Sequence, residues 1–314
     1  MINRLVCLGG GVGTVQVVRG LRPYSTDITV VVSMADDGGS AGRLRRLYSV
    51  PPPGDLINCL AALSDAEPIL KQLLTYRFEG NRWGRLDSIG GHKIGNLILV
   101  ALTKIMGDFH KALLETERLF DCHGKILPST YENVSIWAET TKGDKVVGEE
   151  TIDLGKYREN LYRVYLEPQD VSTPKDVIKA ILRAKIIIIG PGDIYTTILP
   201  VLLVPDIIKA VRISNAKKVF VLNIANKRET EGYTPLDHLD SISRHCPGLK
   251  FDYMVINSNQ KPPILSKLHY RYIPPSPLPP PIYGKILKAD IIDESFPVQH
   301  DPKKLARVVL SILK

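Results

Sequence analysis

The sequence predicts an α/β fold in which helices cover both faces of a mostly parallel β-sheet. Short apolar stretches rich in Val, Ile and Leu alternate along the chain with longer stretches of helical periodicity, and this order is typical of a three-layer α/β protein. The apolar stretches end in Gly, Asn or Asp, which favours strands followed by turns. With 314 residues, 44% of them hydrophobic, the chain can form one large α/β domain or a domain with an inserted lobe.

The expected strands are short and each is rich in Val, Ile or Leu. They occupy residues 4–8, 27–33, 185–189, 218–223 and 252–257. Helical periodicity marks residues 56–64, 92–105, 108–120, 174–184 and 195–211. The final stretch is the clearest helix, because its apolar residues fall on one face: Leu305, Val308, Val309, Ile312 and Leu313.

Two segments depart from this alternation. Residues 124–168 predict a small β excursion, in which 134–140 and 145–151 flank a turn and form a hairpin, with 163–166 as a candidate third strand. Residues 273–282 are rich in proline and must be extended. We expect a rigid surface loop there, and a ligand for an SH3-type domain is the alternative.

Composition and charge narrow the class of protein. No hydrophobic stretch reaches about 18 residues, so no membrane span is expected. The first residues lead directly into a strand and leave no room for a signal peptide, and the four cysteines lack CxxC spacing. We therefore expect a cytoplasmic protein with free thiols and no zinc cluster. The net charge of +8 is spread along the chain, which argues against nucleic-acid binding and is compatible with a phosphate-rich ligand.

A glycine-rich turn follows the first expected strand. Gly9, Gly10, Gly11 and Gly13 precede a helix that we expect to begin near Thr14. Such a turn directs backbone N–H groups and the positive end of the helix at an anion. The spacing matches neither GxGxxG, because Thr14 replaces the last glycine, nor a P-loop, because no Lys follows. The turn indicates phosphate binding, and a tight turn without a ligand is the alternative.

The loop after the second expected strand, residues 35–45, concentrates charge and glycine. It contains Asp36, Asp37, Gly38, Gly39, Ser40 and Arg43. Asp36 is placed to hold ribose hydroxyls if the site binds a dinucleotide. A carboxylate pair beside a phosphate loop also suits Mg²⁺, which takes carboxylate and phosphate oxygens together. Arg43 is the arginine best placed to neutralise the same phosphates.

Two later helix starts carry polar residues. Asp55 follows three prolines and is a natural N-cap, and Asn58 lies one turn later on the same side of the helix. Glycines also open the helix that begins near His92 and carries Asn96 on its first turn. His92 is therefore either a structural residue or a ligand contact.

A second strand-to-helix turn follows residues 185–189. It consists of Gly190, Pro191 and Gly192, and the next helix begins with Tyr195 and Thr196. This turn has the same anion-binding chemistry as the first, and we expect it on the opposite side of a cleft. A nucleotide diphosphate is expected to lie between the two turns.

Five ordered motifs together resemble the gluconeogenesis factor family. They lie at residues 9–13, 35–45, 51–55, 91–96 and 190–196, and the likeness extends to His300 and Asp301 near the end of the chain. This family is the sister group of the 2-phospho-L-lactate transferases, which are CofD-like. The longer motif at 35–45 and the motif at 51–55 place the chain in the gluconeogenesis branch.

The resemblance implies a single CofD-like domain over residues 1–314, Rossmann-like, in three layers and usually dimeric. In the gluconeogenesis branch the ligands are UDP-sugars, chiefly UDP-N-acetylglucosamine, and the role is in carbon metabolism, cell shape and envelope synthesis, without an established reaction. In the transferase branch, a metal held by aspartates assists transfer of phospholactate from a guanosine-linked donor to a deazaflavin, with release of GMP. Asp37 and Asp55 best match those aspartates.

The sequence therefore predicts a nucleotide site with a Mg²⁺ ion. The expected metal ligands are Asp37 and Asp55, and replacing Asp37 by Ala is expected to alter ligand or metal binding more than folding. A phospholactate transferase and an NAD-binding Rossmann enzyme are the alternatives, and catalytic and base-binding residues stay unassigned. The expected nucleotide- and phosphate-binding residues are Gly9, Gly10, Gly11, Gly13, Thr14, Asp36, Gly38, Gly39, Ser40, Arg43, Asn58, His92, Asn96, Gly190, Pro191, Gly192, Tyr195, Thr196 and Asn223.

The chain departs from the family pattern at three places. Ile57 stands where relatives usually carry Arg, which removes one phosphate contact. Asp193 replaces the usual Ser and adds a negative charge where a phosphate or sugar would lie. Residues 226–230 replace a run of the Thr-Gln-Pro-Gly-Glu-Thr type, although Asn223 persists.

Overall fold

The core of the molecule is a parallel sheet of seven strands, in the order β12-β10-β8-β7-β1-β2-β3. The computed structural model describes residues 4–25, 27–84, 88–278 and 284–313. The predicted α/β fold with a mostly parallel sheet is confirmed. The strands are β1 (Leu5–Gly9), β2 (Ile28–Val32), β3 (Lys125–Pro128), β7 (Ile186–Ile189), β8 (Lys217–Val221), β10 (Tyr253–Asn257) and β12 (Lys285–Ala289).

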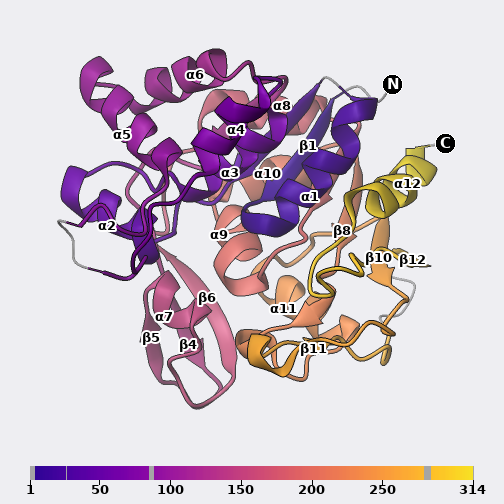
Figure 1. Cartoon of the computed structure of the whole chain (residues 1–314). Coiled ribbons are helices and arrows are strands. Elements are labelled where there is room, and N and C mark those ends of the chain that lie inside the picture. Colours follow the sequence, from indigo (N-terminus) through magenta and orange to yellow (C-terminus); the bar gives the residue numbers. More distant parts are fainter. Residues whose placement is uncertain (1–3, 26, 85–87, 279–283, 314) are drawn as a thin grey trace.

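Helices cover both faces of this sheet, as Figure 1 shows. α1 (Gly11–Leu21) packs against α3 (Gly54–Leu63) and α12 (Pro302–Leu313) on one face, and α8 (Lys175–Arg183) packs against α10 (Pro205–Ile213) on the other. The other α-helices are α2 (Gly39–Tyr48), α4 (Pro68–Thr75), α5 (Ile94–Met106), α6 (Phe109–Leu119), α7 (Glu149–Asp153), α9 (Leu199–Leu202) and α11 (Pro235–His245).

The central strands are buried on both faces. Every side chain of β7 is inaccessible to solvent, and its register aligns Ile186 with Leu5 of β1. Strands buried in this way carry continuous apolar runs rather than alternation. Each buried Ile or Leu contributes about 1.5–3 kcal/mol of transfer free energy, so these strands hold the sheet together.

The chain order of the strands reverses at β1. β1 pairs with β2 on one side and with β7 on the other, and both pairings are parallel. The loops that follow β1 and β7 therefore leave the same edge of the sheet and diverge to opposite faces. In open α/β sheets this switch point is where ligands bind.

A second, antiparallel sheet lies beside the main one (Figure 1). Its strands are β4 (Ser135–Thr140), β5 (Lys145–Val147) and β6 (Leu161–Glu167), in the order β5-β4-β6. The predicted hairpin and third strand are both present. Residues 125–128, at the start of the predicted excursion, instead pair with β2 in the main sheet. The second hairpin strand ends early because Gly148 (φ +93°) turns the chain into α7.

The helix expected over residues 195–211 is interrupted. A π-helical turn at Ile194–Ile198 and α9 come first, and α10 starts only at Pro205. The residue before a proline disfavours the helical region, and Val204 is accordingly extended (φ −67°, ψ 119°). In the described part of the chain no single helix is long and apolar enough to cross a membrane; Ile194–Leu202 and Pro205–Ile213 reach that length only together, across a bend of 76°.

Three smaller features complete the fold. β9 (Ala225–Asn226) pairs with β11 (Arg271–Tyr272) as a short antiparallel ladder. The predicted proline-rich loop begins in the described residues, but its positions 279–282 lie outside them. All four cysteines are free, as expected.

Candidate functional site

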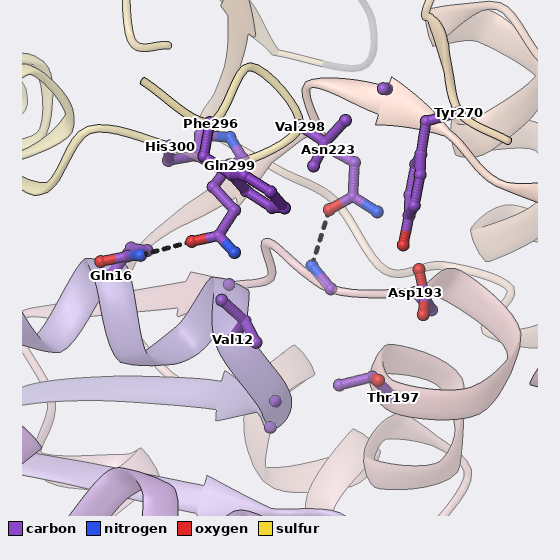
Figure 2. Close-up of a pocket in the computed structure, with 15 residues that line it drawn as sticks. Val12, Gln16, Asp193, Thr197, Asn223, Tyr270, Phe296, Val298, Gln299 and His300 are labelled. Carbon is purple, nitrogen blue, oxygen red and sulfur yellow. Dashed lines mark hydrogen bonds between the residues drawn. The ribbon is translucent and has the colours of Figure 1, made fainter. Parts of the chain in front are cut away.

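A cavity of about 250 Å³ lies at the switch point between β1 and β7. The turn after β1 and the turn after β7 both contribute to its surface, so the predicted cleft between two glycine turns is present (Figure 2). The lining residues are Gly10, Gly11, Val12, Gly13, Gln16, Gly192, Asp193, Thr197, Asn223, Ala225, Tyr270, Phe296, Val298, Gln299 and His300.

The first turn is held by Thr14 and needs its glycines. Thr14 is buried, and its Oγ1 accepts the Gly10 N–H at 2.9 Å. A Cβ on Gly13 would lie 2.4 Å from the carbonyl oxygen of Pro191, so the two turns touch. Gly9 has a φ of +156° and a Cβ there would lie 2.7 Å from Thr14 Oγ1. Thr14 therefore shapes the turn, while Gly10, Gly11 and Gly13 line the cavity.

The second turn is fixed by Asn223. Its Oδ1 accepts the Gly192 N–H at 2.9 Å, as drawn in Figure 2. Gly190 has a φ of +77°, and a Cβ there would lie 2.8 Å from the Val221 carbonyl oxygen. Asn223 and Gly192 both line the cavity, whereas Gly190 and Pro191 form the turn behind it.

Tyr195 and Thr196, predicted to bind the ligand, are buried and do not line the cavity. The Tyr195 hydroxyl lies 2.8 Å from the hydroxyls of both Tyr233 and Ser241. Burial raises the pKa of Tyr195 above its usual range, with Tyr233 adding to the rise. Tyr195 thus anchors the helix start to α11.

Asp36 and Asp55 form a half-buried acidic pair next to the first turn. A Cβ on Gly10 would lie 2.4 Å from Asp55 Oδ2, and the Gly11 N–H donates to the Asp55 carboxylate. Burial and the charge of Asp55 raise the pKa of Asp36 to about 7. Burial also raises the pKa of Asp55. Asp55 is the second residue of α3, whose N-cap is Pro53, so Asp55 is not the N-cap.

Asp37 is turned away from this pair. Its carboxylate accepts the N–H groups of Glu149 at 3.2 Å and Glu150 at 2.9 Å, at the start of α7. The charge of Asp37 also raises the pKa of Asp36, so Asp37 lies near Asp36 and Asp55, but its carboxylate is engaged by α7. The physical reason is that α7, which the sequence did not place, presents two backbone donors to Asp37.

Ser40 and Arg43 hold a neighbouring loop. The Arg43 guanidinium donates to the carbonyl oxygens of Ser88 at 3.0 Å and Gly90 at 2.5 Å, and the side chain is only 2% exposed. Ser40 Oγ accepts a hydrogen bond from Arg77 at 3.0 Å. Arg43, predicted to neutralise phosphates, is thus committed to the backbone of residues 88–90.

Gly38 and Gly39 lie beneath the loop that carries Arg82 and Trp83. A Cβ on Gly38 would lie 3.4 Å from the Trp83 ring, and one on Gly39 would lie 2.8 Å from Arg82 Nε. Gly39 also has a φ of +49°, which favours glycine. These glycines let the loop approach the acidic pair.

Three of the predicted ligand-binding residues lie near Lys93: Asn58, His92 and Asn96. Lys93 Nζ donates to Asn58 Oδ1, and burial together with Arg77 lowers the pKa of Lys93 to about 8. Burial and Arg43 lower the pKa of His92 to about 4, so this imidazole is neutral near pH 7. Within the described residues, His92 Nδ1 and Asn96 Oδ1 are buried without a hydrogen-bond partner.

Sequence reasoning missed one side of the cavity. Phe296, Gln299 and His300 come from the segment between β12 and α12, and Tyr270 precedes β11. Gln299 Oε1 accepts from the Gln16 amide at 2.8 Å, and Figure 2 shows the Gln299 nitrogen on the cavity side. Only His300 had a signal, as the last motif of the family likeness.

Glu149 is a further acidic residue that the sequence did not indicate. Burial, followed by the charges of Asp36 and Asp153, raises its pKa to about 10. A carboxyl group with such a pKa is protonated at neutral pH. Glu149 therefore adds no negative charge to the acidic pair.

The 2-phospho-L-lactate transferase CofD family model matches residues 5–310. The gluconeogenesis factor of Bacillus subtilis is 38% identical over 322 residues, which cover 99% of this chain and 98% of that protein. The chain belongs to the gluconeogenesis factor family. The gluconeogenesis factor of Halalkalibacterium halodurans is 41% identical over 78% of this chain and 74% of its own length.

A crystal structure of a UPF0052 family protein from Bacillus halodurans has the same fold. Its TM-score is 0.88 at 33% identity, and the alignment covers 99% of both chains. Membership of the gluconeogenesis factor family thus agrees with the predicted resemblance over the whole fold.

The acidic pair has suitable oxygen ligands for a metal ion that binds together with a phosphate-containing ligand. Mg²⁺ is usually bound through one or two carboxylates together with substrate phosphates, and Asp36 and Asp55 are two half-buried carboxyl groups whose repulsion a cation would relieve. Among residues 4–25, 27–84, 88–278 and 284–313, no group of three His, Cys, Asp or Glu side chains is spaced to hold a metal. A Mg²⁺ site in this member of the gluconeogenesis factor family therefore needs phosphate oxygens to complete it.

Proposed function

We propose that this protein binds a nucleotide diphosphate of the UDP-N-acetylglucosamine type. The observation that carries the proposal is the cavity enclosed between two glycine turns at the switch point of the sheet. The positive end of α1 favours phosphates at this cavity. The volume of about 250 Å³ lies just below the range usual for ligand pockets, so part of the ligand extends beyond the cavity.

The polarity of the cavity suggests how the ligand lies. We expect the diphosphate at the start of α1, next to Asp55, where Asp36 and Asp55 would hold a Mg²⁺ ion that neutralises the phosphate charge. The base is placed against Phe296, where the Gln299 amide offers a hydrogen-bond donor. Uracil has carbonyl acceptors that match an amide donor.

Calorimetric titration tests this function. UDP-N-acetylglucosamine, UDP, GDP and NADH are titrated separately into the protein with Mg²⁺. We expect saturable binding of UDP-N-acetylglucosamine without turnover, and weaker binding when Mg²⁺ is removed. Absence of any preference for uridine nucleotides would refute the proposal, and a preference for NADH would favour a dinucleotide site.

A transferase activity is the second candidate. It is supported by the match to the 2-phospho-L-lactate transferase model and by the half-buried pair Asp36 and Asp55, which can hold the metal that such a reaction requires. The purified protein is mixed with guanosine-linked phospholactate, a deazaflavin and Mg²⁺. Release of GMP would establish the activity, and absence of GMP at high protein concentration would exclude it.

We further propose that ligand binding makes the protein a cytoplasmic regulator of carbon metabolism, cell shape and envelope synthesis, acting as a homodimer. The family relationship supports this role. Sedimentation at micromolar concentration tests the dimer. Complementation of a deletion strain by a Phe296→Ala variant tests whether the cavity is needed for the role.

A further inference from the structure

An ion pair lies at one side of the cavity. Asp193, in the second turn, lines the cavity, and Lys227 follows β9. Lys227 Nζ lies 3.1 Å from Asp193 Oδ2. Lys227 also pairs with Asp153 of α7. The positive charge of Lys227 therefore offsets the negative charge of Asp193.

This pairing keeps Asp193 compatible with an anionic ligand. Burial alone would lower the pKa of Lys227, but the carboxylates of Asp193, Glu229 and Asp153 raise it above its usual range. The carboxylates therefore favour the charged form of Lys227. An unpaired carboxylate would repel a diphosphate in the same cavity, and the ammonium group offsets that repulsion.

The Asp193 side chain is directed toward Lys227 rather than toward its own helix. Asp193 occupies the N-cap position of the helical segment Ile194–Ile198, where an Asp normally accepts backbone N–H groups, yet it makes no such bond. Its Oδ2 contacts Lys227, and no described residue donates a hydrogen bond to Oδ1. Asp193 lines the cavity, and Figure 2 shows the Tyr270 hydroxyl pointing toward it.

We infer that Asp193 binds a pair of sugar hydroxyl groups of the nucleotide ligand, and that Lys227 is its positioning residue. A carboxylate only accepts hydrogen bonds, whereas a phosphate at neutral pH has few protons to donate and a hydroxyl always has one. A Ser at this position would be shorter and uncharged, so it would lack the bidentate acceptor. The inference rests on the proposed function, and it names Asp193 as the residue that makes the site selective for hydroxylated sugars.

Four probes separate the sources of those hydroxyls. UDP against 2′-deoxy-UDP tests the ribose, UDP-N-acetylglucosamine against UDP tests the distal sugar, and pyrophosphate tests the phosphates alone. We expect the wild-type protein to bind UDP roughly 10-fold more tightly than 2′-deoxy-UDP, or UDP-N-acetylglucosamine roughly 10-fold more tightly than UDP. This is the usual effect of a charge-assisted hydrogen bond. Dissociation constants are measured by calorimetry with Mg²⁺.

Variants of Asp193 test the assignment. In Asp193→Ser the preference should fall to within about 3-fold, and in Asp193→Asn, which conserves shape, it should fall part of the way. Asp153→Asn is the matched control, because Asp153 also contacts Lys227 but does not line the cavity. It should keep the full preference. The affinity for pyrophosphate should be unchanged or increased in both Asp193 variants.

Variants of Lys227 test its positioning role. Lys227→Met should weaken pyrophosphate binding by roughly 10-fold, because Asp193 is then an unpaired charge, and Lys227→Arg should restore it. In the Asp193→Ser background, Lys227→Met should weaken pyrophosphate binding no further. A purely structural role of Lys227 would give the same loss in both backgrounds and would overturn the positioning role.

The outcomes separate this inference from the function on which it rests. Wild-type protein that binds none of the four probes refutes both. Protein that binds UDP and UDP-N-acetylglucosamine but shows no preference in either pair refutes the inference alone. An unchanged preference in both Asp193 variants refutes it as well.

Discussion

The carboxylate of Asp55 lies directly against the backbone of Gly10. A Cβ built on Gly10 would lie only 2.4 Å from Asp55 Oδ2, and the N–H of Gly11 donates to the same carboxylate. The turn after β1 and the first turn of α3, 45 positions apart in the sequence, thereby form one side of the candidate site. This contact explains why a glycine is required at this position even though the backbone of Gly10 is extended (φ 173°).

Replacing Gly10 by Ala should therefore destabilise the protein through a steric clash. Forcing a methyl group against a packed side chain costs about 1–3 kcal/mol, measured as the change in the free energy of unfolding in urea. The double variant Gly10→Ala/Asp55→Ala should recover part of the loss, because the colliding carboxylate is gone. A Gly10→Ala variant as stable as the wild type would contradict the contact.

Replacing Asp37 by Ala should lower stability rather than metal affinity. Asp37 accepts two backbone N–H groups at the start of α7, and loss of such a cap costs about 1–2 kcal/mol. Asp36→Asn should instead affect metal affinity rather than stability. Asn still accepts the Gly38 N–H, but the substitution removes a charge from the acidic pair. It should change the Mg²⁺ dependence of nucleotide binding with little loss of stability.

Urea denaturation and calorimetry with and without Mg²⁺ measure both effects. A loss of Mg²⁺-dependent binding in a stably folded Asp37→Ala protein would support the sequence-based expectation for Asp37 instead.

The fold was largely predictable because its central strands are buried on both faces. β1, β2 and β7 carry continuous apolar runs, and the sequence places each within one or two residues. β3 and β12 lie at the edges of the sheet and were not predicted as strands. Lys285–Ala289 mixes lysines with apolar residues because it is covered on one side only, so it lacks the signal of a buried strand.

The same limit explains the part of the site that was missed. Without β12, nothing placed the segment from Phe296 to His300 at the carboxyl edge of the sheet. A different limit applies to Thr14, Arg43 and Tyr195. A motif shows that a residue belongs to a loop, but the direction of its side chain depends on neighbours distant in sequence, such as Ser88 and Ser241.

The stability of the protein should depend on pH through Glu117. This residue of α6 accepts the Ile126 N–H at 2.8 Å, and burial raises its pKa from 4.5 to about 7. Because the folded state holds the proton more tightly than the unfolded state, stability should fall as the pH rises from about 4.5 to 7. The size of this contribution is of the order of 1–3 kcal/mol.

Glu117→Gln keeps the acceptor but cannot ionise, so it should remove this part of the pH dependence. Glu115→Gln is the matched control on the same helix, because Glu115 pairs with Arg118 at the surface. Urea denaturation at pH 5 and pH 8 measures both. An equal pH dependence in the wild type and Glu117→Gln would show that Glu117 does not titrate in this range.

Phe296 should contribute to binding of the base but not of the phosphates. Its ring lines the cavity and is 41% exposed, so it is accessible to a ligand there. Stacking against a base is worth about 1–1.5 kcal/mol beyond area burial, so Phe296→Ala should weaken UDP binding by roughly 10-fold. Pyrophosphate, which has no base, should bind with unchanged affinity.

Tyr24→Ala is the control, because Tyr24 is 45% exposed and does not line the cavity. Equal losses for UDP and pyrophosphate in Phe296→Ala would mean that the residue shapes the cavity as a whole, and the base would then have to be placed elsewhere.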